Sequence, residues 1–252
     1  MPANKVAIVT GGSRGIGRNA VLRLAKQGVH AIFTYKSSRA DADEVVALTA
    51  ESGAQAIALQ LDVGDTNTFD GFVNDVRKAL AELGVERFDY LVNNAGTSSG
   101  ASLATITEAE MDSLYQVHFK GVLFLTQKLL PLINDGGRIV NISSGLARVA
   151  MPNRIGYGPI KAAVEALTRY LAVELAPRRI VANVIAPGAI ATDFSGGIVR
   201  DNPQVNKAVA DMTALGRVGV ADDVGPVIAA LLSDDFGWVN AQRIEVAGGM
   251  HI

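Results

Sequence analysis

A tyrosine and a lysine stand four residues apart in the segment GYGPIKAAVEALTRY, which covers residues 156–170. Proline lacks an amide hydrogen and is tolerated in the first turn of a helix, so Pro159 predicts that a helix begins close to it. Tyr157 then lies at the start of that helix, and Lys161 lies one turn along on the same face. Both side chains could therefore reach into a single cleft.

A phenol and an ammonium group at this spacing could move a proton. The phenol of tyrosine has a pKa near 10 and is a poor base at neutral pH, whereas a neighbouring ammonium favours the phenolate. At roughly 5 Å and an effective dielectric constant of about 20, the pair energy is about 3 kcal/mol, on the order of two pKa units. We therefore expect Lys161 to bring the pKa of Tyr157 toward the working range for acid–base chemistry on a carbonyl or an alcohol.

Seven short apolar runs alternate with segments of helical period, and they would form the scaffold for this pair. The runs cover residues 5–9, 31–35, 56–61, 88–92, 138–142, 180–185 and 243–246. Strands that are apolar almost throughout are covered by helices on both faces, so the pattern predicts an α/β fold with a parallel sheet. The spacing of Phe69, Phe72, Val76 and Leu80 predicts one of the helices. No linker interrupts the alternation, and we expect one domain over residues 1–252.

The longest stretch without a predicted strand lies between Ile190 and Gln242. An insertion of this kind, at about residues 190–217, is where an α/β enzyme would build a lid or a substrate pocket. Its part TDFSGGIVRDNPQVN is the least regular.

A glycine-rich loop, TGGSRGIG, follows the first predicted strand. Gly11 permits the sharp turn, Gly15 lets the backbone approach a pyrophosphate, and Gly17 lets helix and strand pack closely. The helix that follows offers free amide groups to phosphate, and Ser13, Arg14 and Ile16 fill the loop. The spacing differs from the longer dinucleotide motif and from the Walker loop, yet its place in a strand–loop–helix unit predicts a nucleotide cofactor.

The end of the second predicted strand indicates which cofactor. An acid there would hold the ribose of NAD, whereas a cation would accommodate the additional phosphate of NADP. The sequence has Tyr35 at this point, followed by Lys36, Ser37 and Ser38. With Arg14 on the same side, these residues favour NADP(H), and NAD(H) stays open as the alternative. The competing interpretation is that Lys36 and Arg14 are solvated surface charges.

Taken together, these motifs resemble those of the short-chain dehydrogenase/reductase family. The matching pieces are TGGSRGIG, LDV (residues 61–63), NNAG (93–96), ISS (142–144), YGPIK (157–161) and NVIAPGAIATD (183–193). Their order and spacing cover essentially the whole chain. The resemblance implies a doubly wound, seven-stranded, Rossmann-like fold and hydride transfer between a nicotinamide cofactor and a carbonyl or alcohol.

The resemblance also implies roles for individual residues. Ser144, Tyr157 and Lys161 would be catalytic, with Ser143 as the adjacent alternative to Ser144 for hydrogen bonding to the substrate oxygen. Tyr157 and Lys161 would also contact the cofactor, with Lys161 at the nicotinamide ribose. Further cofactor contacts implied by the motifs are Asp62 and Val63 at the adenine, Asn93, Ala95 and Gly96 along the cleft, and Pro187, Gly188, Ile190 and Thr192 at the nicotinamide end.

One position departs from the family pattern. The family usually has an asparagine in the helix after NNAG, and its main-chain carbonyl is thought to hold a water that leads to the lysine. Here YQVHFKG places His118 at that position. We therefore include His118 among the candidate catalytic residues and expect only its backbone carbonyl to be required. His118 as a metal ligand would need partners, and His30 and His251 lie in other segments, so no metal site is expected.

Composition narrows the remaining possibilities. The 252 residues carry a formal net charge of -2 and no cysteine, which gives no electrostatic case for nucleic acid and excludes disulfides and thiolate sites. The N-terminal segment has no recognisable leader, and no run approaches the roughly 18 apolar residues of a membrane span. We expect a cytoplasmic protein without a membrane partner. Trp238 is expected in the core or the wall of a pocket.

Three functions remain in view. The leading one is an NADP-dependent carbonyl reductase or alcohol dehydrogenase that acts on a small molecule. A 3-oxoacyl-carrier-protein reductase ranks lower, because a carrier protein is acidic and INDGG offers Asn134 and Asp135 rather than cations, although Arg178 and Arg179 weaken that objection. The third is a non-catalytic nucleotide-binding sensor.

The resemblance implies a homodimer or homotetramer. The broad apolar stripe after Lys161, which includes Leu167, Tyr170 and Leu171, fits a partner subunit.

Overall fold

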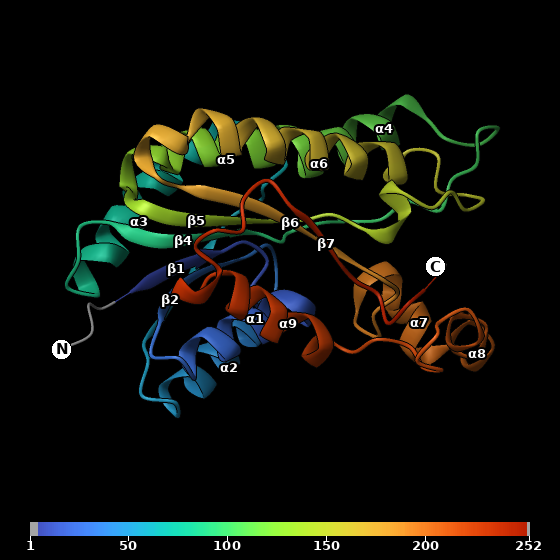
Figure 1. The fold of residues 1–252 in the computed structure, drawn as a ribbon, viewed down its shortest axis with the longest axis horizontal. Helices are drawn as coiled ribbons and strands as arrows, with labels where there is room; N and C mark the ends of the chain where they lie inside the picture. Colours follow the sequence, from blue (N-terminus) through green and yellow to red (C-terminus); the bar gives the residue numbers. More distant parts are fainter. Residues whose placement is uncertain (1–4, 251–252) are drawn as a thin grey trace.

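A sheet of seven parallel strands runs through the centre of the computed structural model, which describes residues 5–250 (Figure 1). The strands are β1 (Val6–Val9), β2 (His30–Tyr35), β3 (Ala56–Gln60), β4 (Phe88–Asn93), β5 (Ile133–Ile142), β6 (Val181–Pro187) and β7 (Arg243–Val246). Their order is β3-β2-β1-β4-β5-β6-β7, and every neighbouring pair is parallel. The doubly wound, Rossmann-like fold predicted from the sequence is confirmed.

Helices cover both faces of this sheet (Figure 1). On one face lie α3 (Phe69–Glu82), α5 (Gly121–Leu129) and α6 (Tyr157–Glu174), and on the other lie α1 (Gly15–Ala25), α2 (Arg39–Ala50) and α9 (Ala221–Leu231). Side chains alternate between the faces of a strand, so Val6 and Ile8 pack on the α3 side while Ala7 and Val9 pack on the α1 side. Burial on both sides explains why the strands are apolar throughout.

The strand order reverses between β1 and β4. From β1 the chain builds outward to β2 and β3, and β4 then lies on the opposite side of β1. The connections at the carboxyl ends of β1 and β4 therefore separate, and this switch point is where open α/β sheets bind ligands.

The remaining helices lie around the carboxyl end of the sheet. α4 (Glu108–Tyr115) runs through a π-helical turn (Gln116–Lys120) into α5, and the predicted insertion at 190–217 contains α7 (Ile198–Asp201) and α8 (Pro203–Asp211). Ser195, Gly196 and Gly197 precede α7 with φ of 56°, 69° and 75°. Three consecutive left-handed residues turn the chain back toward the sheet, and two glycines make this inexpensive.

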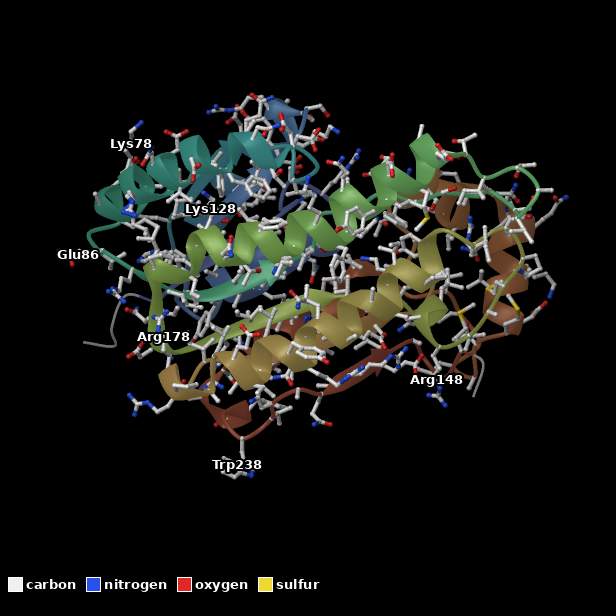
Figure 2. All side chains as sticks on the ribbon, turned by 90° about the horizontal axis from the view of Figure 1, so that it is seen from above. Lys78, Glu86, Lys128, Arg148, Arg178 and Trp238 are labelled. Atoms are coloured by element: carbon white, nitrogen blue, oxygen red, sulfur yellow. The ribbon has the colours of Figure 1, made fainter. Side chains whose placement is uncertain are left out.

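Two sequence expectations differ from the structure. β5 begins at Ile133 rather than at residue 138, because the glycine-containing segment INDGG joins the sheet through a register shift opposite Phe88 and Tyr90. Trp238 does not lie in the core or in a pocket wall: its side chain is 99% exposed and projects from the edge of the molecule (Figure 2). The adjacent Val239 packs against the core instead, which turns Trp238 outward.

Candidate active site

A cavity of about 600 Å³ opens at the carboxyl ends of the strands. One half is lined by the glycine loop after β1 and by the residues that end β2, β3 and β4. The other half is lined by Ser144, Tyr157 and Lys161 and by side chains from α7 and α8. The same cavity is therefore lined by the glycine loop and by the candidate catalytic residues.

Tyr157 and Lys161 meet at the floor of this cavity. α6 begins at Tyr157, and Pro159 lies in its first turn as the sequence predicts. Lys161 lies one turn further along, with its Nζ 5.6 Å from the centre of the Tyr157 ring. Both side chains are buried, and Lys161 Nζ donates a hydrogen bond to the carbonyl oxygen of Ile142 at 2.8 Å. The amine is thereby fixed against the end of β5.

Burial controls the acidity of both groups. It raises the pKa of Tyr157 above the ordinary value of 10, with the Ser144 hydroxyl and the charge of Arg154 opposing the rise. Burial also lowers the pKa of Lys161 to about 7. The expectation that Lys161 brings the pKa of Tyr157 into the working range is therefore wrong, because desolvation outweighs attraction to an amine that is itself hard to charge. Tyr157 is a protonated phenol at neutral pH.

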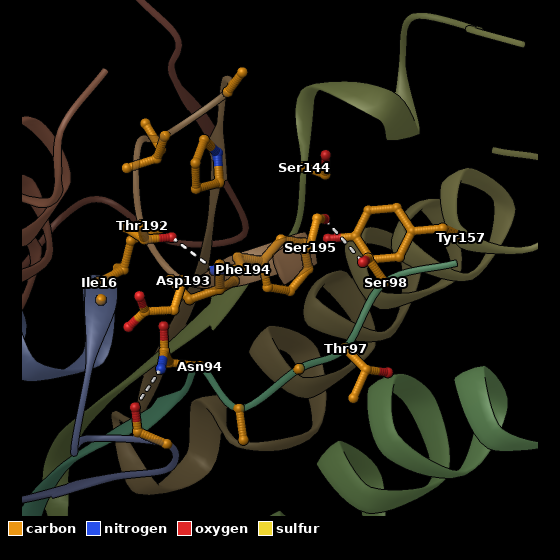
Figure 3. Close-up of a pocket in the computed structure, with 18 of the residues that line it drawn as sticks. Ile16, Asn94, Thr97, Ser98, Ser144, Tyr157, Thr192, Asp193, Phe194 and Ser195 are labelled. Carbon is orange, nitrogen blue, oxygen red and sulfur yellow. Dashed lines mark hydrogen bonds between the residues drawn. The ribbon is translucent and has the colours of Figure 1, made fainter. Parts of the chain in front are cut away.

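Two consecutive serines follow β5 and take different partners. The Ser144 hydroxyl accepts a hydrogen bond from the amide of Leu146 at 3.2 Å and lies beside the cavity near Tyr157 (Figure 3). The Ser143 hydroxyl is buried and donates to Glu165 Oε1 at 2.8 Å. Ser143 is therefore committed to the packing of β5 on α6, and Ser144 is the serine available to a substrate oxygen.

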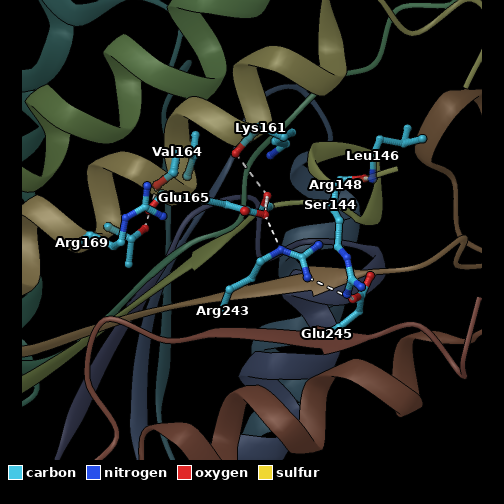
Figure 4. Close-up of polar contacts among 11 residues, drawn as sticks. Ser144, Leu146, Arg148, Lys161, Val164, Glu165, Arg169, Arg243 and Glu245 are labelled. Atoms are coloured by element: carbon cyan, nitrogen blue, oxygen red, sulfur yellow. Dashed lines mark hydrogen bonds and ion pairs between the residues drawn. The ribbon is translucent and has the colours of Figure 1, made fainter. Parts of the chain in front are cut away.

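A chain of charged contacts continues from Ser143 to the edge of the sheet (Figure 4). Glu165 Oε1 accepts a hydrogen bond from Arg243 Nε at 2.7 Å. Arg243 Nη1 and Arg148 Nη1 both donate to Glu245 Oε2, at 3.0 Å and 3.2 Å. These contacts join α6, β7 and the turn after Ser144, so they hold the two elements that carry the candidate catalytic groups.

His118 lies in the π-helical turn, where it is 1% exposed. Its Nε2 is 2.7 Å from the carbonyl oxygen of Thr97, and its ring meets the edge of the Tyr157 ring at a centroid distance of 5.3 Å. Burial and the nearby Lys161 hold the pKa of His118 well below its ordinary value, so the imidazole is neutral. The side chain fixes the loop after β4 against Tyr157, and the expectation that only its backbone carbonyl is required for catalysis stays a prediction.

The residues predicted to bind a cofactor fall into two groups. Those that line the cavity are Gly11, Ser13, Arg14, Gly15, Ile16, Tyr35, Lys36, Ser37, Asp62, Val63, Ala95, Gly96, Tyr157, Lys161, Pro187, Gly188, Ile190 and Thr192. Gly17 and Asn93 are not among its lining residues. A Cβ on Gly17 would meet the carbonyl oxygen of Gly11, so this glycine packs the loop on its own helix.

Asn93 is turned into the protein, where its amide donates to Thr126 and to Asn141 at 3.1 Å and 2.8 Å. The neighbouring Asn94 lines the cavity instead and donates to the carbonyl oxygens of Thr10 and Gly11. Asn94 therefore fixes the glycine loop, a role that the pair of consecutive asparagines did not reveal in the sequence.

The charges near the end of β2 are partly paired. Lys36 Nζ forms an ion pair with Asp62 Oδ2 at 2.7 Å, and this contact lowers the pKa of Asp62. Ser38 accepts a hydrogen bond from the amide of Asp41 and caps α2. Arg14 forms no ion pair with the carboxylates of residues 5–250, so its charge is available at this end of the cavity.

The far end of the cavity is lined largely by the predicted insertion at 190–217, whose individual lining residues the sequence did not single out. Phe194 lies beside Tyr157 at a ring distance of 6.2 Å, and Ser195 contacts Ser98 through their hydroxyls at 2.8 Å, which joins two loops across the cavity (Figure 3). Apolar lining residues here are Leu146, Val149, Met151, Ile198, Val205, Val209, Met212 and Met250. Four of them lie in the predicted insertion, and only the fold brings the segments that contain Leu146 and Met250 beside it.

No helix within residues 5–250 has the length and apolarity to cross a membrane. The same residues contain no group of three or more histidine or acidic side chains arranged to hold a metal ion, and His251 lies outside the described residues.

Comparisons with known proteins agree over nearly the full chain. The family model described as enoyl-(acyl carrier protein) reductase matches residues 11–251. An uncharacterised oxidoreductase of Methylorubrum extorquens is 38% identical, with 98% of this chain and 97% of that protein aligned. The hydroxynaphthalene reductase-like protein Arp2 of Metarhizium brunneum is 34% identical over 98% of this chain and 95% of its own length. A short-chain type dehydrogenase/reductase of Picea abies is 36% identical over 97% and 92%.

Solved structures give the same result. The promiscuous reductase LugOII, which catalyses keto-reduction at C1 during lugdunomycin biosynthesis, superposes with a TM-score of 0.93 at 36% identity and covers 98% of both chains. The angucycline C-6 ketoreductase LanV with bound NADP superposes with a TM-score of 0.93 at 32% identity over 98% of this chain and 95% of LanV.

Proposed function

The chain belongs to the short-chain dehydrogenase/reductase family and is an NAD(P)-dependent oxidoreductase of carbonyl and alcohol groups, and from this premise we propose that it reduces a ketone with NADPH and uses Tyr157 as the general acid. The observation that carries the proposal is the meeting of Tyr157, Lys161 and Ser144 in one cavity with the glycine loop.

The raised pKa of Tyr157 suits proton donation. A phenol that stays protonated at neutral pH can give its proton to a carbonyl oxygen as that oxygen gains negative charge. Ser144 would hydrogen-bond the same oxygen and stabilise the developing charge. The nicotinamide cofactor, when bound, supplies the hydride. Lys161, whose pKa is about 7, can take up and release protons at the ambient pH and thereby restore the proton of Tyr157.

The glycine loop and its surroundings fit a dinucleotide. Gly11 and Gly15 have φ of 65° and 56°, a conformation that exposes backbone amides at the start of α1 to a phosphate. Arg14, Ser37 and Lys36 line the part of the cavity where a 2′-phosphate would lie, and Tyr35 stands in place of an acid. NADP bound to LanV and NADPH bound to a blue fluorescent protein of similar fold support the same choice. NAD(H) is the alternative cofactor.

The apolar end of the cavity supports a cyclic ketone as the substrate. Phe194 lies next to Tyr157, and Leu146, Val149 and Met212 add apolar surface. Such walls bind flat or bulky rings through burial of apolar area. Similar proteins include a tetrahydroxynaphthalene reductase of Pestalotiopsis fici and an angucycline ketoreductase, which favours bicyclic or larger aryl ketones.

An acyl-carrier-protein reductase is less well supported, although the matching family model bears such a description. Docking of an acidic carrier protein requires free cations near the cavity. Neither Arg178 nor Arg179, the two cations that the sequence offered, lines the cavity, and Arg178 pairs with Asp135 at 2.7 Å and donates to the carbonyl oxygens of Leu130 and Ile133. The charge of Arg178 is therefore paired within the fold and is not free to bind a carrier protein.

Steady-state reduction of a panel of aryl ketones, aliphatic ketones and 3-oxoacyl thioesters, each with NADPH and NADH, tests the proposal. We expect turnover of the bicyclic aryl ketones with NADPH. Preferential turnover of the thioesters would favour the carrier-protein function. Binding of NADPH without turnover of any compound would favour a nucleotide-binding sensor.

We also propose a homo-oligomer, a dimer or a tetramer. Tyr170 and Val173 on α6 are 69% and 73% exposed, and Phe124 on the neighbouring α5 is 36% exposed. Apolar side chains grouped in this way favour burial against a second copy. Sedimentation of the wild type and of the Tyr170→Glu, Val173→Glu double variant tests this: dissociation of the variant supports the proposal, and a monomeric wild type contradicts it. The cytoplasmic location stays a prediction.

A further inference from the structure

An arginine without a carboxylate partner lies at the substrate end of the cavity. Arg154 stands three residues before Tyr157, lines the cavity and is half-buried. Its Nη1 donates to the carbonyl oxygen of Ser99 at 2.9 Å and, more weakly, to that of Asn153 at 3.4 Å. None of the ion pairs formed within residues 5–250 includes Arg154. Arg154 therefore has no counter-ion within these residues.

Each acidic group at this end of the cavity is already paired with an arginine. Asp193 pairs with Arg200 at 2.5 Å, and Glu245 pairs with Arg243 at 3.0 Å and with Arg148. Arg154 is therefore a cation at this end of the cavity whose charge no carboxylate of residues 5–250 pairs with.

The orientation of Arg154 leaves part of its guanidinium group accessible. Nη1 is anchored to the loop after β4, while Nε and Nη2 form no hydrogen bond with residues 5–250 and are not among the buried unpartnered atoms of these residues. Two adjacent N–H groups in one plane match the two oxygens of a carboxylate. The cofactor's phosphates do not account for this charge, because they belong with the glycine loop and Arg14 at the other end of the cavity.

We propose that Arg154 is a specificity-determining residue that binds a carboxylate on the ring system of the substrate, so that the enzyme prefers keto acids with an apolar body to neutral ketones. The inference rests on the proposed carbonyl reduction. Arg154 positions the substrate, and Tyr157 and Ser144 act on its carbonyl.

Matched substrates test this inference. The probes are the ring-carboxylated isomers of α-tetralone and their methyl esters, which share shape but differ in charge. For the preferred acid, Arg154→Gln is expected to raise KM about tenfold, equivalent to about 1.4 kcal/mol, whereas kcat/KM for the ester stays within about twofold. Arg154→Lys, which keeps the charge and loses the planar fork, should recover part of the loss. Arg77→Gln, on the exposed face of α3, is the control.

The outcomes separate the two proposals. Equal loss for acid and ester in Arg154→Gln, or no loss for either, overturns the role of Arg154 while leaving ketone reduction intact. A wild type that reduces neither contradicts the proposed function. In that case calorimetric binding of the acids and esters to the protein–NADPH complex decides the inference: tighter binding of an acid that Arg154→Gln abolishes supports it, and equal binding of acid and ester overturns it.

Discussion

Arg14 is predicted to set the preference for NADPH over NADH, and Arg14→Ala is the change that tests this. Arg14 lines the cavity within the glycine loop and has no carboxylate partner among residues 5–250. Lys36 lies on the same side, but its Nζ is 2.7 Å from Asp62 Oδ2. Arg14 can therefore bind the additional phosphate of NADPH directly, whereas Lys36 first has to leave Asp62.

The expected magnitudes follow from these surroundings. A hydrogen bond to a charged group contributes about 1.5–3 kcal/mol, and Arg14 is exposed, so we take the lower end of that range. Arg14→Ala should lower kcat/KM for NADPH about tenfold and leave the value for NADH nearly unchanged. Lys36 is 67% exposed and Asp62 is 41% exposed, and a pair of this kind contributes about 0.2–1 kcal/mol. Lys36→Ala should therefore cost only about threefold with NADPH.

The assay is the ratio of kcat/KM for NADPH to that for NADH in the wild type, in both single variants and in the double variant. Arg18→Ala is the matched control, because Arg18 lies on α1 and is engaged with Glu44 at 2.6 Å. High ionic strength should reduce the difference between wild type and Arg14→Ala. An unchanged ratio in Arg14→Ala, or an equal loss with both cofactors, would refute the assignment of this charge.

Three further predictions concern the fold and the proton path. Gly17→Ala should destabilise the protein by about 1–3 kcal/mol, because the new Cβ would meet the carbonyl oxygen of Gly11, whereas Gly71→Ala, in open space on α3, should be neutral or stabilising in the same urea titration. The pKa of Lys161 is about 7 in the folded protein and 10.5 in the unfolded chain, so the unfolded chain binds more protons between these values. The free energy of unfolding of the wild type relative to Lys161→Met should accordingly rise from pH 7 to pH 9, by up to about 1.4 kcal/mol per pH unit, and a flat difference contradicts the buried amine. His118→Asn should change kcat by about tenfold or less, and a loss of several orders of magnitude would show that the imidazole takes part in proton transfer.

The fold could be predicted because it depends on local patterns. The apolar runs, the glycine loop and Pro159 each specify a strand, a turn or a helix start through a few neighbouring residues. β5 was predicted too short, because its first residues, INDGG, have turn composition and join the sheet only through pairing with Phe88 on β4. Trp238 was misplaced for a related reason: hydrophobicity does not reveal which of two adjacent residues the tertiary structure turns inward.

The site residues could be predicted only where they belong to a local sequence motif. Tyr157, Lys161 and Ser144 lie in such motifs and meet in the cavity. The acidity of Tyr157 was not predictable, because it depends on how deeply the folded protein buries the phenol. The contact between Lys36 and Asp62 and the placement of Arg154 beside the loop after β4 likewise join segments distant in sequence. Only the tertiary structure brings these charges together.

The most direct measurement is ketone reduction by Tyr157→Phe alongside calorimetric titration with NADPH. General acid catalysis contributes about 10²–10⁴-fold to a rate, so kcat should fall by at least about a hundredfold while the affinity for NADPH stays close to that of the wild type. A variant that binds NADPH normally and still reduces the ketone at a rate near that of the wild type would contradict the assignment of the phenol as the proton donor.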